Sequence, residues 1–413
     1  MTIELIIIGD EILNGRTVDA NLAWLAPWLF KQGLKLGNVS IVRDDQAQML
    51  AALELAWSRS DIVLTSGGIG PTLDDLTKTV LADFAGKKLQ DNKLARSIVE
   101  NNYARLQRPW SPSTNGYHLI PEDFLATDNP GGLAPGLVWF NDKKALMAAP
   151  GVPKEFALMV EHVFFGLLKE NGFNVAGDQA QVIIRTYGVP EEKIFGELCP
   201  NLWQQLEVFG KVSSLPHLTG VDILVTFDGA NKKNKFQNEI QTIVESSALS
   251  GHVWQWGELS LEQLIVNLAT QKGLTFCFAE SCTGGLAASK ITDIAGSSKV
   301  FLGSAVTYAN QAKSELIGVS PTSLESFGAV SEQVAQEMAQ GALQKFGADF
   351  CISFSGIAGP DGGTELKPVG LVCQGFASKD KNQSRSLQFR GDRLKLKERF
   401  ALSGLFWLLE QLS

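Results

Sequence analysis

A serine and a cysteine stand side by side at positions 281 and 282, within the stretch AESCTGG. Either side chain can act as a nucleophile, but it needs a neighbouring base that accepts its proton. The usual base is histidine, yet all four histidines of the chain lie at or before residue 252. A nucleophile at this position must therefore use a histidine from a distant part of the chain or a different base.

Lysine, tyrosine and carboxylates are the alternatives to histidine. The stretch GSAVTYANQAK places Tyr308 and Lys313 five residues apart, across a predicted boundary between a strand and a helix. A lysine that is removed from water has a lowered pKa and can serve as the base for Ser281. The same residues also fit a structural interpretation, with Lys313 on a solvated helix face, Tyr308 half buried in a strand and Cys282 a small buried side chain.

The pattern LTFCFAESCTGGLAASKI predicts a turn between a strand and a helix. Unpaired N–H groups at a helix start can hold an anion or an oxyanion, although a plain tight turn with a serine or threonine cap is equally consistent. A second glycine-rich loop, SFSGIAGPDGG, follows another predicted strand and could supply further amides. The candidate binding residues of these two loops are Cys282, Thr283, Gly284, Gly285, Ser355 and Gly356.

An arginine stands at the predicted start of the last helix, in the stretch FRGDR. Arg393 there suits a phosphate or a carboxylate of a ligand, although a structural ion pair with Asp392 is an alternative.

A glycine-rich loop also follows a predicted strand near the amino terminus, in DIVLTSGGIGPTLDDLTKTV. Its amides could hold a phosphate, with Gly67, Gly68, Gly70 and Thr72 as the candidate residues. Asp74 and Asp75 beside an anion would repel it, so we expect a divalent cation, Mg, Mn or Co, between them. Acidic residues at other predicted strand ends could converge there, and the candidate metal ligands are Asp74, Asp75, Asp44 and Glu11, with Asp10 and Asp45 nearby. The alternative is that Asp74 only caps a helix.

Composition limits the classes of function. The formal charge of −8 excludes non-specific nucleic-acid binding, which needs a basic surface. The five cysteines are odd in number and scattered, which predicts a reduced, cytoplasmic protein. No run of about 18 apolar residues occurs, so we expect neither a membrane span nor a signal peptide.

The order of predicted elements divides the 413 residues into three parts. Strands alternate with helices over residues 1–171 and again over 258–413, which predicts parallel sheets with loops at the carboxyl ends of the strands. Residues 172–254 are predicted to form a small α+β module, and HVWQWGE at 252–258 is predicted to link it to the third part.

Four motifs of the third part, AESCTGG, VTYANQAK, SGIAGPDGGTELKPVG and GDR, resemble the CinA carboxyl-terminal domain. The stand-alone form of that domain is nicotinamide-mononucleotide deamidase (PncC). The resemblance implies hydrolysis of nicotinamide mononucleotide to nicotinic acid mononucleotide and ammonia without a cofactor. It places the family's nucleophile on Ser281 and the motif lysine and tyrosine on Lys313 and Tyr308. The family often has threonine where this chain has Ser355, a departure that keeps the hydroxyl.

GDEILNG, SGGIGPTLDDLT, NPGGLAPG and APGVPKEF resemble the MoaB/MogA-like domain that begins CinA proteins. The implied fold class is α/β, with a three-layer amino-terminal domain, the small α+β middle module and a carboxyl-terminal α/β deamidase domain. In CinA proteins the first domain is associated with metal-dependent ADP-ribose pyrophosphatase activity, and in the wider superfamily it binds molybdopterin. The resemblance also implies a homodimer.

The leading hypothesis is a two-site enzyme of pyridine-nucleotide recycling that acts on nicotinamide mononucleotide and on ADP-ribose. A first rival makes the amino-terminal domain a molybdopterin-binding module without hydrolytic activity. A second rival is a competence-linked interaction protein with decayed sites, which the intact carboxyl-terminal motifs disfavour.

Overall fold

The computed structural model describes residues 1–72 and 75–413, and these residues form two compact units. The first unit comprises Met1–Gln181 and Thr226–Lys235, and the second comprises Val182–Val225 and Phe236–Ser413. The chain therefore returns briefly to the first unit after it has entered the second.

A six-stranded sheet forms the centre of the first unit. Its strands are β1 (Ile3–Ile8), β2 (Leu36–Val42), β3 (Ile62–Ser66), β6 (Leu125–Thr127), β7 (Gly136–Asn141) and β8 (Lys144–Ala149). They lie in the order β2-β1-β3-β8-β7-β6. Strands β2, β1, β3 and β8 run parallel to one another. Strand β7 is antiparallel to β8, and β6 is antiparallel to β7. The carboxyl ends of β1, β2 and β3 therefore meet at one edge of the sheet.

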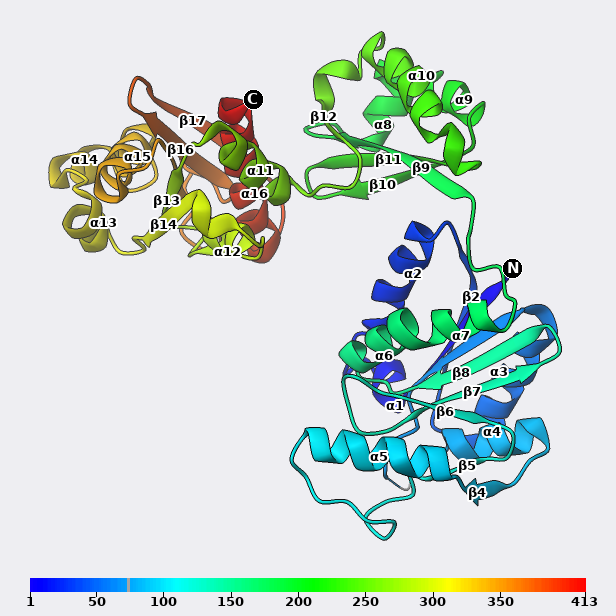
Figure 1. The fold of residues 1–413 in the computed structure, drawn as a ribbon. Helices are drawn as coiled ribbons and strands as arrows, with labels where there is room; N and C mark the ends of the chain where they lie inside the picture. The colour runs from blue at the N-terminus through cyan, green and yellow to red at the C-terminus, as the bar shows by residue number, and fades with distance from the viewer. Residues whose placement is uncertain (73–74) are drawn as a thin grey trace. The chain divides into compact units, whose positions relative to one another are not determined.

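Helices cover both faces of this sheet (Figure 1). They are α1 (Asp10–Leu13), α2 (Asn21–Lys31), α3 (Gln46–Arg59), α4 (Thr77–Ala85), α5 (Lys93–Arg105), α6 (Pro153–Met159), the π-helix Val160–Phe164 and α7 (Phe165–Glu170), and the short strands β4 (Leu89–Asp91) and β5 (Leu119–Pro121) form a separate pair. Successive residues of a strand point to opposite faces. Accordingly, Leu5 and Ile7 pack in a core with α2 and α6, whereas Ile6 and Ile8 pack in a core with α3 and α4. The predicted three-layer α/β architecture is confirmed.

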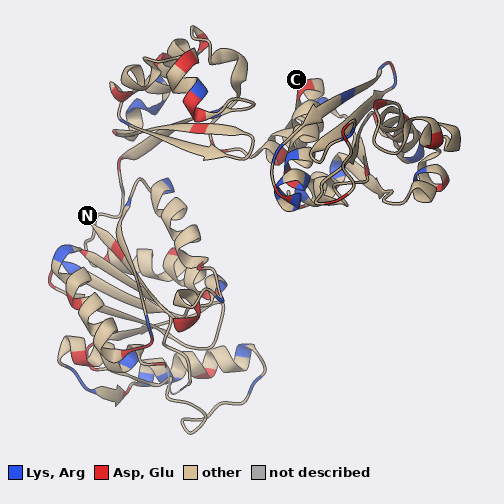
Figure 2. Cartoon of the chain, turned by 180° about the vertical axis from the view of Figure 1, so that it is seen from behind, with Lys and Arg blue, Asp and Glu red and all other residues tan. Residues whose placement is uncertain are grey.

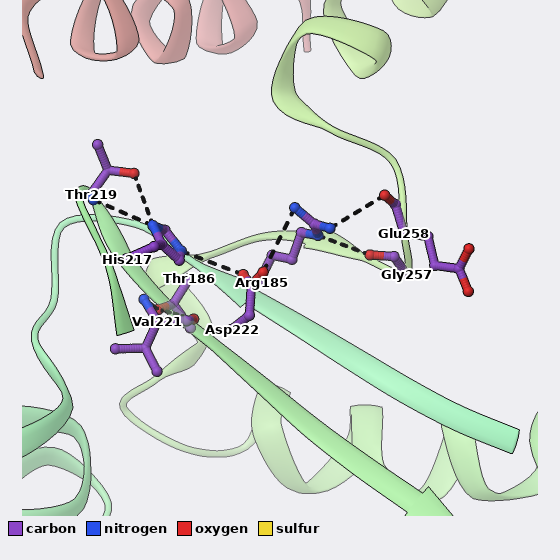
Figure 3. Close-up of polar contacts among 8 residues, drawn as sticks. All are labelled: Arg185, Thr186, His217, Thr219, Val221, Asp222, Gly257 and Glu258. Carbon is purple, nitrogen blue, oxygen red and sulfur yellow. Dashed lines mark hydrogen bonds and ion pairs between the residues drawn. The ribbon is translucent and has the colours of Figure 1, made fainter. Parts of the chain in front are cut away.

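The middle module is a four-stranded antiparallel sheet with short helices. It contains β9 (Gln179–Thr186), β10 (Lys211–His217), β11 (Gly220–Asp228) and β12 (Val253–Trp256), in the order β10-β11-β9-β12, with α8 (Glu191–Lys193), the π-helix Ile194–Leu198, α9 (Leu202–Glu207) and α10 (Lys233–Glu245). Polar contacts join neighbouring strands of this sheet (Figure 3). The guanidinium of Arg185 donates to the Gly257 carbonyl (3.0 Å) and lies 3.7 Å from Asp222, whose other oxygen lies 3.4 Å from Nε2 of His217.

A five-stranded sheet organises the carboxyl-terminal part. Its elements are β13 (Phe276–Glu280), β14 (Phe301–Val306), β15 (Phe350–Gly356), β16 (Leu371–Ser378) and β17 (Asn382–Gln388), with helices α11 (Leu261–Lys272), α12 (Leu286–Thr292), α13 (Asn310–Ile317), α14 (Pro321–Phe327), α15 (Glu332–Phe346) and α16 (Arg393–Leu412). The strand order is β14-β13-β15-β16-β17. Phe276 and Phe278 of β13 pack with α11 and α16, and Cys277 and Ala279 pack with α15 on the other face. Strand β13 lies between β14 and β15 and is parallel to both, so the chain segments that follow these three strands meet at one edge.

The structure confirms most of the predicted elements and corrects one of them. The link predicted at 252–258 is wrong in part, because Val253–Trp256 forms β12 and pairs antiparallel with β9. The alternating large side chains of VWQW suit an edge strand better than a linker.

Lys and Arg are interspersed with Asp and Glu in both units (Figure 2). All five cysteines are free and buried. Within the described part of the chain, every helix is too short or too polar to cross a membrane.

Candidate active site

Ser281 lies in the tight turn between β13 and α12. Its N–H donates to the carbonyl of Phe354 in the neighbouring strand β15 (2.9 Å), and its carbonyl accepts the N–H of Gly284 (3.1 Å). Gly284 and Gly285 have φ values of +63° and +94°, a region that glycine adopts without strain. The Gly-Gly pair therefore allows the chain to reverse direction immediately after the serine.

Lys313 of α13 reaches the serine from the segment that follows β14. Its side chain is 1% exposed, and Nζ lies 3.1 Å from Oγ of Ser281. Nζ also donates to the carbonyls of Thr307 (2.9 Å) and Tyr308 (3.3 Å). Burial lowers the pKa of Lys313 because it disfavours the charged ammonium.

These contacts suit a neutral lysine that acts as a base. A neutral amine has two N–H donors and one lone pair. The two backbone carbonyls can take the two N–H groups, which leaves the lone pair directed at the hydroxyl of Ser281. In this state the serine donates its proton to Nζ, which is the geometry that activates a hydroxyl for attack.

Cys282 is placed differently from its neighbour. Its side chain is buried in the core formed by β13, α11, α12 and α16. Burial raises the pKa of its thiol to about 12, so the reactive thiolate is scarce at neutral pH. Of the two adjacent nucleophiles, Ser281 has the buried lysine within hydrogen-bonding distance of its reactive atom, whereas burial keeps the Cys282 thiol in its protonated, less reactive form.

A cavity of about 200 Å³ opens beside Ser281 and Lys313. Tyr308 and Arg393 stand at its mouth. The Tyr308 side chain is 64% exposed, and its Oη accepts a hydrogen bond from Arg393 (3.4 Å). Arg393 also donates to the carbonyl of Gly359 (2.6 Å). The structure thus brings Ser281, Lys313, Tyr308 and Arg393 to one cavity, whose further lining residues are Cys282, Asn310, Ala329, Val330, Ser355, Gly356 and Ala358. The predicted binding residues Thr283, Gly284 and Gly285 are not among those that line it.

Several of the predicted oxyanion donors are already engaged inside the protein. The N–H of Gly284 donates to Ser281, that of Gly285 donates to the carboxylate of Glu280 (2.9 Å), and that of Ile357 donates to Leu371 (2.9 Å). The N–H groups of Cys282 and Thr283 are directed at the Cys282 thiol, and of the candidate glycines Gly356 lines the cavity. Ser355 is 1% exposed, and its hydroxyl donates to the carbonyl of Ala329 (2.5 Å). This hydrogen bond joins two segments that line the cavity.

A second cavity, of about 730 Å³, lies in the first unit at the carboxyl ends of β1 and β3. Its lining includes Gly67, Gly68, Gly70, Asp75, Asp44 and Glu11. A Cβ atom at Gly67 would lie 2.3 Å from the carbonyl oxygen of Ile8, and one at Gly70 would lie 2.5 Å from Asp75. The glycines are therefore required by close backbone and side-chain approach.

The predicted metal ligands are only partly brought together. Asp74 lies outside the described residues. Oδ2 of Asp75 accepts the N–H of Thr72 (2.8 Å), so that this amide is engaged within the loop. Among residues 1–72 and 75–413, no group of three or more His, Cys, Asp or Glu residues is placed to hold a metal ion.

The two neighbouring acidic candidates have structural partners. Asp10 pairs with Arg43 (3.0 Å), and Asp45 caps α3 by accepting the N–H of Gln48 (2.9 Å). The described residues thus supply an acidic lining to this cavity rather than a complete metal site.

The sequence prediction missed several residues at the two cavities. Glu280 ends the apolar strand LTFCFAE, and a charged residue at the end of a buried strand was the signal that could have identified it. Arg108, Tyr117 and Glu155 line the amino-terminal cavity from loops and α6. They are distant in sequence from the glycine-rich loop and carry no local signal.

Comparison with known proteins identifies the family of this chain. The model of the CinA C-terminal domain matches residues 258–412, and the model described as the probable molybdopterin binding domain matches residues 4–170. A CinA-like protein of Chloroherpeton thalassium is 36% identical over 423 residues, covering 100% of this chain and 100% of its own length. The chain belongs to the CinA family.

Other CinA proteins match over one part or the whole of the chain. A CinA-like protein of Kosmotoga olearia is 35% identical over 98% of this chain and 97% of its own length. Among solved structures, the competence/damage inducible protein CihA of Agrobacterium tumefaciens is 38% identical, with a TM-score of 0.36, and covers 37% of this chain and 96% of its own chain. The family membership therefore covers the full length of this chain.

Proposed function

We propose that the carboxyl-terminal site hydrolyses the carboxamide of nicotinamide mononucleotide to give nicotinic acid mononucleotide and ammonia. The observation that carries the proposal is the 3.1 Å contact between Nζ of buried Lys313 and Oγ of Ser281. It provides a nucleophile and a base in a part of the chain, 258–413, that contains no histidine.

The reaction follows from these two side chains. Lys313 takes the hydroxyl proton as Oγ of Ser281 bonds to the carboxamide carbon, and a tetrahedral oxyanion forms. Its collapse breaks the C–N bond, and the nitrogen leaves as ammonia with the proton that Lys313 returns. The resulting ester on Ser281 is hydrolysed by water, which gives its proton to Lys313 and frees the serine.

The residues around the cavity support binding of the nucleotide and of the oxyanion. Arg393 at the mouth would hold the 5′-phosphate, since a guanidinium forms strong charge-assisted hydrogen bonds with phosphate. The N–H of Gly356, a residue that lines the cavity, would face the oxyanion. This chemistry needs no cofactor.

The test is to incubate the full chain with nicotinamide mononucleotide and to measure ammonia and nicotinic acid mononucleotide. We expect both products in equal amounts, with the Ser281→Ala variant inactive. A folded wild-type chain that leaves the nucleotide unchanged would exclude this substrate.

We also propose that the amino-terminal cavity binds ADP-ribose and cleaves it to AMP and ribose 5-phosphate with a divalent metal. The supporting observation is a cavity of about 730 Å³ that combines a glycine-rich loop with five described acidic residues, Glu11, Asp19, Asp44, Asp75 and Glu155. Asp75, Asp44, Glu11 and Asp74 would hold the metal, which would supply Lewis-acid chemistry. The described residues do not by themselves complete a metal site.

Product analysis with ADP-ribose, with and without Mg²⁺, Mn²⁺ or Co²⁺, tests this second proposal. Binding of molybdopterin without turnover of ADP-ribose would favour the alternative of a molybdopterin-binding module. Absence of both would favour a competence-linked interaction protein. A cytoplasmic homodimer remains the expected state of the protein.

A further inference from the structure

Glu280, the last residue of β13, carries a buried carboxylate directly before the proposed nucleophile. Its side chain is 0% exposed. In the described part of the chain its partners are hydrogen-bond donors of the backbone and of a serine rather than a lysine or arginine. Burying a carboxylate in the protein interior costs free energy unless several hydrogen-bond donors compensate its charge.

Four donors surround the carboxylate. Oε2 accepts the N–H groups of Gly285 (2.9 Å) and Ala287 (3.1 Å), and Oε1 accepts the N–H of Ala288 (3.0 Å) and the hydroxyl of Ser304 (2.9 Å). All four neighbours donate hydrogen bonds to Glu280. An ionised carboxylate can only accept hydrogen bonds, so these donors are suitable partners for it.

The bonds of Glu280 close a loop of chain around Ser281. They run from the residue before the serine to the first turn of α12, and they include Ser304 of the neighbouring strand β14. On its other side, Ser281 is held to β15 through the hydrogen bond from its N–H to Phe354 (2.9 Å). Ser281 is therefore fixed between two strands by contacts that lie behind the cavity, whereas its Oγ faces Lys313.

The same bonds remove three amides from the start of α12. The N–H groups of residues 285, 287 and 288 are therefore not available to a ligand. Arg393 is left to bind an anion at the mouth of the cavity.

From these contacts we infer that Glu280 is a positioning residue for the nucleophile. It keeps Oγ of Ser281 within hydrogen-bonding distance of Nζ of Lys313. This inference rests on the proposed role of Ser281 as the nucleophile but not on the identity of the substrate. Misplacement of a reacting group by about 1 Å can slow a reaction about 100-fold.

The Glu280→Gln variant tests the inference because its size is unchanged and one acceptor oxygen becomes a donor facing other donors. We expect kcat for nicotinamide mononucleotide to fall about 100-fold, with little change in KM. A second readout is the rate at which a serine-directed fluorophosphonate labels Ser281 in the full chain, located by peptide mass spectrometry. That rate should fall by a similar factor.

Glu337→Gln is the matched control. The Glu337 carboxylate also accepts a backbone N–H, from Ser320 (3.0 Å), and a serine hydroxyl, from Ser323 (2.6 Å), but it lies away from the cavity lining. This variant should change the melting temperature without changing kcat or the labelling rate. A merely structural role for Glu280 predicts that the two variants behave alike once rates are normalised to the folded fraction.

A further variant covers the case in which Glu280→Gln does not fold. Ser304→Ala removes one of the four donors and leaves no unpaired backbone group. It should slow labelling about fivefold, as expected for the loss of one ordinary hydrogen bond.

Wild-type rates in folded Glu280→Gln, or in Ser304→Ala when the first does not fold, would overturn the inference. A wild-type chain that is labelled at Ser281 yet does not hydrolyse the nucleotide would reject the proposed substrate, and the labelling rates would still test Glu280. A wild-type chain that is neither labelled nor active would reject Ser281 as the nucleophile and the role of Glu280 with it.

Discussion

The two cavities are built on similar local sequences but place their carboxylates in opposite positions. Each begins with a buried strand that ends in a glycine-rich turn before a helix, at β13 and at β3. At the carboxyl-terminal turn, Glu280 lies behind the turn and is saturated by donors. At the amino-terminal loop, Asp75, Asp44 and Glu11 line the cavity itself.

This difference separates the chemistry that each site can perform. The carboxylate of Glu280 points away from the carboxyl-terminal cavity, which presents a serine, a buried lysine and an arginine. These are the groups that the proposed hydrolysis of an anionic amide requires. The acidic lining of the amino-terminal cavity would repel a phosphate unless a cation stood between them. A glycine-rich turn after a strand therefore does not by itself show which ligand a site binds. The position of the nearest carboxylate must also be known.

The largest effect should come from the base of the carboxyl-terminal site. Lys313→Met keeps a long apolar stem in the buried position and removes the amine, so kcat should fall about 10³-fold. Initial rates of ammonia release measure this, and equilibrium binding of the nucleotide should change little. Lys290→Met, which alters a pair with Glu398 elsewhere in the same domain (3.2 Å), is the control. A similar loss in both variants would count against a specific role for Lys313.

A smaller loss is expected from one acidic residue of the amino-terminal cavity. Asp75→Ala should lower metal-dependent ADP-ribose cleavage about 30-fold, within the range for a group that positions a catalytic ion, and leave ammonia release unchanged. Asp91→Ala, which breaks an exposed pair with Arg96 in the same unit, should affect neither reaction. Loss of both activities in Asp75→Ala would show that the two sites are not independent.

Arg393 should act on binding rather than on the reaction. Arg393→Ala removes charge-assisted hydrogen bonds to the phosphate, so KM should rise about tenfold with kcat nearly unchanged. Arg390→Ala removes a neighbouring positive charge that does not line the cavity and should raise KM less. Steady-state kinetics at several ionic strengths distinguish the two, and equal effects would contradict direct phosphate binding by Arg393.

The pH profile is the mildest perturbation. Lys313 must be neutral to accept a proton, and burial lowers its pKa. The neutral fraction, and with it kcat/KM, should therefore rise with pH through a midpoint below the ordinary lysine value of about 10.4. If the Cys282 thiolate were the nucleophile, the rise would instead lie near its pKa of about 12. A profile without a limb below the ordinary lysine value would contradict a neutral lysine base.

Much of this arrangement could be predicted from the sequence. Apolar runs identified β1, β3, β13 and β15, and parallel pairing placed the segments after β13, β14 and β15 together. That is why Ser281 and Lys313, 32 residues apart, could be expected at one edge of the sheet. The motif order then restricted the chemistry.

Other features depend on three-dimensional closure and were not predictable. Whether an amide near Ser281 is available depends on Glu280, whose side chain reaches forward eight residues to Ala288. The sequence pattern does not distinguish Asp10, which pairs with Arg43, from Glu11, which lines the cavity. Such choices depend on side-chain directions that local periodicity does not encode.

The central claim is that Ser281, and not the adjacent Cys282, attacks the carboxamide. The most direct test compares initial rates of ammonia release from nicotinamide mononucleotide for Ser281→Ala and Cys282→Ser, both shown to be folded. We predict that Ser281→Ala is inactive while still binding the nucleotide, and that folded Cys282→Ser keeps most of the wild-type activity. The Cys282 side chain takes no part in the proposed reaction, so the cost of burying a hydroxyl in this core should lower stability rather than the rate. An inactive Cys282→Ser beside an active Ser281→Ala would contradict the account.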